Sequence, residues 1–82
     1  MIVVSSETKK AQEEILDKAV EYFRDKIGLK ITERGSCCVN FVDKNQIGYV
    51  SVTLAKEGNK FKVDVESREY EYQAKEFIRT LK

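Results

Sequence analysis

Apolar and polar residues alternate with a period of two along most of the second half of this chain. Four such segments cover residues 29–34, 37–43, 47–55 and 60–67. Alternation of this kind is typical of β-strands that bury one face and expose the other. The connections between the segments are short and contain Gly or Asn, which tolerate the backbone angles of tight turns. The four strands are therefore predicted to form an antiparallel meander.

The first 28 residues predict a short strand and then a long amphipathic helix. Residues 1–5 form one largely apolar run. Over residues 8–27, apolar side chains recur at spacings of three and four, which is the period of a helix with one buried face. These apolar positions are Ala11, Ile15, Leu16, Ala19, Tyr22, Phe23 and Ile27. Gly28 follows at the position where a left-handed C-terminal cap is expected.

A second helix is predicted after the fourth segment of the meander, with Ser67 as its cap. Glu69 and Glu71 suit the positive end of its dipole, and Arg79 suits the other end. Its buried stripe consists of Tyr70, Ala74, Phe77, Ile78 and Leu81. The predicted order is β-α-β-β-β-β-α, a two-layer α+β sandwich with both helices on one face of the sheet. Residues 1–82 are expected to form a single domain.

One face of the predicted sheet is polar, and we call it the open face. Its members are Cys38, Asn40, Tyr49, Ser51, Thr53, Lys62, Asp64 and Glu66. The intervening positions on the same strands are apolar and are expected to pack against the helices. Tyr, Ser, Thr and Asn mixed with balanced charges suit polar, adaptable protein interfaces. The open face is therefore the candidate interaction surface.

The charges of the chain are balanced overall and along its length. Fifteen basic and fourteen acidic residues give a formal net charge of +1, and no segment is polybasic. Steering toward nucleic acid or an anionic membrane is therefore not expected. No run approaches the ~20 apolar residues needed to cross a bilayer, and the cytoplasm is the expected location. The charged fraction of 35% without Pro or His favours a heat-adapted source.

Cys37 and Cys38 are the residues with the greatest chemical potential. Neighbours on a strand point to opposite faces, so we expect one thiol in the core and the other on the surface. A bond between adjacent cysteines would distort a regular strand, so free thiols are predicted. A zinc site is not expected, because the chain has no His and no CxxC spacing. The pair is weak evidence for a redox function.

The segment from Asp43 to Gly48 resembles the start of a calcium-binding loop. Oxygen-bearing side chains occupy its first and third positions and Gly its sixth. The pattern then fails, because Ile47 occupies the fifth position and Leu54 stands where a bidentate Glu is needed. A hairpin turn explains the same residues, and it is the preferred interpretation.

Residues suited to catalysis are scarce. Asp64 and Glu66 share a strand face about 7 Å apart, given a rise of ~3.3 Å per residue. Lys60, Lys62 and Arg68 lie close to them in the sequence, which favours surface ion pairing over a catalytic carboxylate pair. The chain has no His to serve as a base, and its four glycines are dispersed rather than grouped in a phosphate loop. We expect no enzymatic activity, no metal and no cofactor.

These patterns favour a small interaction module that contacts a protein partner, or a second copy, through its sheet face or an edge strand. A first alternative is a small-ligand binder, because the element order resembles a shortened helix-grip domain, in which a curved sheet wraps a long helix. The resemblance covers element order alone, and the apolar residues are just numerous enough to fill the core and leave little cavity. A second alternative is weak single-stranded nucleic-acid binding through Tyr49, Lys60 and Lys62. Platforms that stack bases carry two or three aromatic rings, however, and the open face has one.

Overall fold

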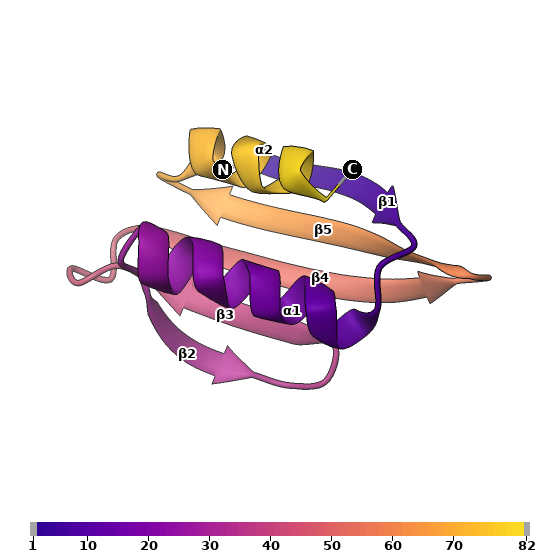
Figure 1. Cartoon of the computed structure of the whole chain (residues 1–82). Helices are drawn as coiled ribbons and strands as arrows, with labels where there is room; N and C mark the ends of the chain where they lie inside the picture. Colours follow the sequence, from indigo (N-terminus) through magenta and orange to yellow (C-terminus); the bar gives the residue numbers. More distant parts are fainter. Residues whose placement is uncertain (1, 82) are drawn as a thin grey trace.

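The computed structural model describes residues 2–81 and has one antiparallel sheet with helices on one of its faces (Figure 1). The elements are β1 (Ile2–Thr8), α1 (Gln12–Val20), the π-helix η1 (Glu21–Lys26), β2 (Lys30–Arg34), β3 (Cys38–Val42), β4 (Tyr49–Glu57), β5 (Lys60–Arg68) and α2 (Glu71–Thr80). The predicted two-layer α+β architecture is confirmed. The predicted strands of the meander agree with the observed ones to within two residues.

The strand order of the sheet is β1-β5-β4-β3-β2, and every neighbouring pair is antiparallel. Strands β2 to β5 form the predicted meander. Strand β1 lies beside β5 at one edge, so the chain crosses the sheet through α1 and η1 to begin β2 at the other edge (Figure 1). This placement of the first strand could not be derived from the sequence pattern.

The core fills the space between the sheet and the helices. Phe23 of η1 lies between Phe41 of β3 and Phe77 of α2, with ring centroids 5.3 Å away in each case. All three rings are fully buried. The sheet contributes the apolar positions Val39, Phe41, Val50, Val52, Leu54, Val63 and Val65, which are all buried. Burying each such side chain stabilises the fold by roughly 1.5–3 kcal/mol relative to exposing it.

The first helix differs from its prediction at both ends. Its start is later than residue 8, because Thr8 is the buried last residue of β1. After Val20 the helix widens into η1, in which the amide of Ile27 donates to the carbonyl of Tyr22 at 3.0 Å. Gly28 then adopts a φ of +95°, as a left-handed cap requires.

Ser67 does not cap the second helix, and that prediction is wrong. It belongs to β5, where it pairs with Ile2 and Val50 and faces the core. The alternation of β5 continues one step beyond Val65 and so buries the serine hydroxyl. Helix α2 begins only at Glu71 and has no side-chain N-cap hydrogen bond.

Candidate functional site

The sheet face opposite the helices carries all eight residues of the open face. The strand register arranges them in rows that cross the sheet. One row consists of Val3, Glu66, Ser51 and Asn40, and the next consists of Ser5, Asp64, Thr53 and Cys38. Thr53 is exposed, and the other seven open-face residues are half-buried by their neighbours. The structure thus brings the candidate residues together on one continuous surface.

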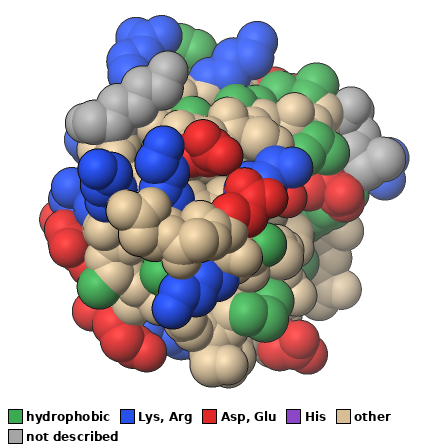
Figure 2. Space-filling model, turned by 90° about the vertical axis from the view of Figure 1, so that its right-hand side faces the viewer, with side chains coloured by type: hydrophobic (Ala, Val, Ile, Leu, Met, Phe, Trp, Pro, Cys, Tyr) green, Lys and Arg blue, Asp and Glu red, His purple; other side chains and the backbone are tan. Residues whose placement is uncertain are grey.

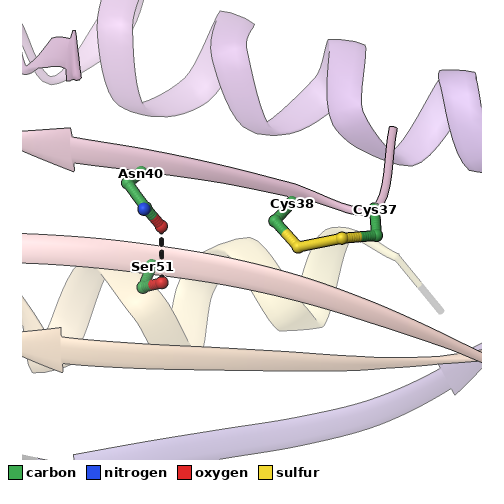
Figure 3. Close-up of a disulfide and its surroundings, with 4 residues drawn as sticks. All are labelled: Cys37, Cys38, Asn40 and Ser51. Atoms are coloured by element: carbon green, nitrogen blue, oxygen red, sulfur yellow. Dashed lines mark hydrogen bonds between the residues drawn. A yellow bond between two sulfur atoms is a disulfide. The ribbon is translucent and has the colours of Figure 1, made fainter. Parts of the chain in front are cut away.

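Two hydroxyl hydrogen bonds connect neighbouring strands across this surface. Ser51 Oγ donates to Asn40 Oδ1 at 2.6 Å between β4 and β3 (Figure 3). Ser5 Oγ of β1 donates to Asp64 Oδ1 of β5 at 2.5 Å. Each bond restricts the rotamers of both side chains, so part of the open face is ordered in the structure.

A third bond links β4 to β5 through Tyr49 and Glu66. The Tyr49 hydroxyl donates to Glu66 Oε2 at 2.7 Å. This hydrogen bond, together with burial and the negative charge of Glu66, raises the pKa of Tyr49 above its ordinary value, although Arg68 opposes the change. The ion pairing predicted for Asp64 and Glu66 is wrong, since within residues 2–81 their carboxylates accept these hydroxyl hydrogen bonds instead.

Cys37 and Cys38 are joined by a disulfide at the start of β3, next to the Asn40–Ser51 pair (Figure 3). The predictions of free thiols and of one buried thiol are both wrong. Cys37 is exposed and Cys38 is half-buried. The reason is that β3 begins at Cys38, so Cys37 lies in the turn and the alternation of a strand does not separate the two side chains. The disulfide therefore lies at the rim of the open face.

The β3–β4 loop is a turn organised by Asp43, as the hairpin interpretation predicts. Its carboxylate accepts hydrogen bonds from the amides of Ile47 (3.0 Å) and Gly48 (3.1 Å), and from the hydroxyl of Tyr70 (3.3 Å). Burial by itself would raise the pKa of Asp43, but these hydrogen bonds hold it below its ordinary value. Within residues 2–81, no three His, Cys, Asp or Glu side chains are grouped to hold a metal ion.

A shallow groove lies on the helical side of the molecule, where η1 meets the end of α2. It is lined by Lys18, Glu21, Tyr22, Lys26 and Thr80. The Lys26 ammonium lies 5.7 Å from the centre of the Tyr22 ring and covers one face of it. The groove is open to the surface, whereas the space between sheet and helices is filled by the aromatic core. The sequence pattern did not predict the groove, because Lys18, Glu21, Lys26 and Thr80 lie outside the two predicted apolar stripes.

Charges of both signs are mixed at one end of the molecule. Figure 2 shows the end of the molecule at which β4 turns into β5, and Lys and Arg side chains lie there beside Asp and Glu side chains. This mixture agrees with the formal net charge of +1. Long-range steering of a strongly charged partner is therefore not what this surface favours.

No family model matches this chain, and no curated protein matches it. None of the helices within residues 2–81 is long and apolar enough to cross a membrane.

Proposed function

We propose that this chain is a non-enzymatic interaction module that forms a two-fold dimer through the edge of β1 and presents its open face to a protein partner. The observation that carries the proposal is the contrast between the two edges of the sheet. Edge strands expose unpaired backbone groups, and proteins that remain monomeric usually protect them with charges, bulges or short length.

Strand β2 has this protection and β1 does not. Over its five residues, β2 contains Lys30, Glu33 and Arg34, and its register with β3 shifts after Ile31. Strand β1 has seven residues in unbroken register with β5. Its sequence, IVVSSET, contains a single charged residue. The β1 edge is thus long, regular and nearly uncharged, which are the properties of a strand that pairs with another chain.

A second copy fits this edge. Antiparallel pairing about a two-fold axis at Ser5 places Ser5 opposite Ser5 of the second copy and uses all seven residues of the strand. Glu7 then lies opposite Val3 of the second copy, so no like charges face each other. Val3, whose side chain is 59% exposed, gains a neighbour across the axis. Because the axis is perpendicular to the sheet, both open faces lie on the same side and form one continuous surface.

The open face is suited to a polar protein partner. Its hydroxyl hydrogen bonds between β1 and β5, between β5 and β4, and between β4 and β3 hold side chains in fixed rotamers. These side chains therefore lose less conformational entropy when a partner binds than freely rotating side chains would lose. Tyr, Ser and Asn also supply rigid contact area and adaptable hydrogen bonding, as in antibody paratopes.

The test compares two lysine substitutions beside the same carboxylate. Ser5 and Thr53 lie opposite Asp64 from its two sides, on β1 and β4. Ser5→Lys places two ammonium groups opposite each other at the two-fold axis, whereas Thr53→Lys adds the same charge away from the edge. In native mass spectrometry and light scattering we expect a dimer for the unmodified chain and for Thr53→Lys, and a monomer for Ser5→Lys.

Two results would contradict the proposal. An unmodified chain that is monomeric over the whole accessible concentration range would rule out self-association. A Thr53→Lys variant that is monomeric while Ser5→Lys stays dimeric would move the contact from the edge to the open face. Circular dichroism of both variants controls for loss of the fold.

A further inference from the structure

The Cys37–Cys38 disulfide is placed where a reagent in solution can reach it. It joins the turn after β2 to the first residue of β3, at the opposite side of the sheet from the β1 edge. The Cys37 side chain is exposed and the Cys38 side chain is half-buried. Cys38 pairs in register with Thr53, whose side chain is also exposed. An attacking thiol therefore has a more open path to the sulfur of Cys37 than to that of Cys38.

The bond contributes little to holding the fold together. A disulfide stabilises a protein mainly by closing a loop of the unfolded chain, and the effect grows with the length of that loop. Here the two cysteines are adjacent, so the bond closes no intervening loop. The turn is held independently by its backbone, because the Gly35 amide donates to the Cys38 carbonyl and the Leu54 amide donates to the Cys37 carbonyl, both at 2.8 Å.

From these two observations we propose that Cys37 and Cys38 form a reversible redox site that exchanges two electrons with small thiols while the fold stays intact. The proposal is separate from dimerisation, since the site and the β1 edge lie at opposite sides of the sheet.

The exchange proceeds in two balanced steps. A thiolate attacks the sulfur of Cys37, the Cys37–Cys38 bond breaks, and its electron pair goes to Cys38, which takes a proton from water. A second thiolate then attacks the outer sulfur of the mixed disulfide and releases Cys37 as a thiolate. Two small thiols are oxidised to one small disulfide, and the protein disulfide is reduced to two thiols. The small disulfide reverses both steps.

The charge near Cys37 and Cys38 determines how reactive their thiols are. Arg34 is the nearest cation in the sequence, but its guanidinium contacts Asp17 at 2.9 Å and Glu13 at 3.8 Å. Arg34 is therefore held by α1 rather than directed at a sulfur, so it does not strongly activate the thiols. We expect a site that follows the ratio of thiol to disulfide around it, rather than a rapid oxidoreductase.

The experiment equilibrates the full chain with mixtures of reduced and oxidised glutathione, quenches with acid, alkylates free thiols and counts them by mass spectrometry. We expect one reversible transition in which both thiols appear together, with an unchanged far-ultraviolet circular dichroism spectrum. Three results would overturn the proposal: a disulfide that resists every ratio, a protein–glutathione mixed disulfide as the end state, or unfolding on reduction.

Single-cysteine variants test the order of attack. Cys38→Ser leaves the exposed Cys37, and Cys37→Ser leaves the half-buried Cys38. With an aromatic disulfide reagent, we expect the Cys37 thiol to react several-fold faster than the Cys38 thiol. Equal or reversed rates would overturn the assignment of Cys37 as the attacked sulfur.

Discussion

The Tyr70 hydroxyl donates a hydrogen bond of 3.3 Å to Oδ2 of Asp43, and this contact joins the start of α2 to the β3–β4 loop. The same loop brings Gly48 against the ring of Tyr70. Burial, the charge of Asp43 and this hydrogen bond raise the pKa of Tyr70 above its ordinary value. Two residues 27 positions apart in the sequence thus connect the start of the last helix to the β3–β4 loop.

Asp43→Asn should lower the free energy of unfolding at neutral pH and have little effect in acid. The folded-state pKa of Asp43 lies below its ordinary value, which is about 3.9 in an unfolded chain. The ionised carboxylate therefore adds stability above pH 4, and that stability is lost as the pH falls through the lowered pKa. Urea unfolding at pH 7 and pH 3 measures the difference between the two chains.

The matched control for this substitution is Asp25→Asn, which removes an exposed carboxylate whose partner is the neighbouring Arg24. Exposed ion pairs contribute little, so the control should leave the unfolding midpoint nearly unchanged. A destabilisation by Asp43→Asn of the same size at pH 7 and pH 3 would show that the ionised carboxylate is not the stabilising group.

Gly48→Ala should destabilise the chain by about 1–3 kcal/mol, the usual range for overpacking. A Cβ atom at Gly48 would lie 2.6 Å from Cε2 of Tyr70 and 3.0 Å from the carbonyl oxygen of Arg68. Gly35→Ala is the control, because a Cβ there meets nothing within 4 Å. Thermal unfolding of both variants provides the comparison. Equal stability of the two variants would contradict the prediction, because it would show that the Tyr70 ring and the backbone at Arg68 shift without cost.

Much of the fold could be predicted because burial in a sheet has the period of the strand itself. Val50, Val52 and Leu54 alternate with polar residues and are buried in the structure. The open face follows from the same rule with no further information. The pairing of β1 with β5 could not be predicted, because it joins residues as far apart as Ile2 and Ser67. A short apolar run contains no signal that selects its neighbour in the sheet.

The predictions for the two cysteines and for Ser67 are wrong because one sequence signal is compatible with two local structures. Alternation separates neighbouring side chains only within a strand, and Cys37 lies in the turn before β3. Ser67 has a side chain suited to a helix cap, but it continues the buried positions of β5 after Val63 and Val65 and lies in the core. In both cases the end of a strand lay one residue away from the predicted position.

Ser67→Ala should stabilise the chain by about 1 kcal/mol. The Ser67 hydroxyl is fully buried and has no hydrogen-bond partner within residues 2–81. Leaving such a group unsatisfied costs roughly 1–3 kcal/mol, and alanine removes it while losing only one oxygen of packing. Ser51→Ala is the matched control, since the hydroxyl of Ser51 is satisfied by Asn40 and its removal should not stabilise. Urea unfolding that ranks Ser67→Ala below the unmodified chain would contradict this prediction.

Glu66→Gln should lower the pKa of Tyr49 toward its ordinary value. The hydrogen bond and negative charge of Glu66 are two of the causes that raise this pKa, and a neutral amide removes the charge. The chemical shifts of the Tyr49 ring, followed by NMR in alkaline solution, report its titration separately from the other tyrosines. Asp64→Asn is the control on the same face, because its carboxylate bonds with Ser5 rather than Tyr49. If Glu66→Gln left the titration of Tyr49 unchanged, the bond between β4 and β5 would not persist in solution. The open face would then lack the ordered side chains on which its proposed binding role depends.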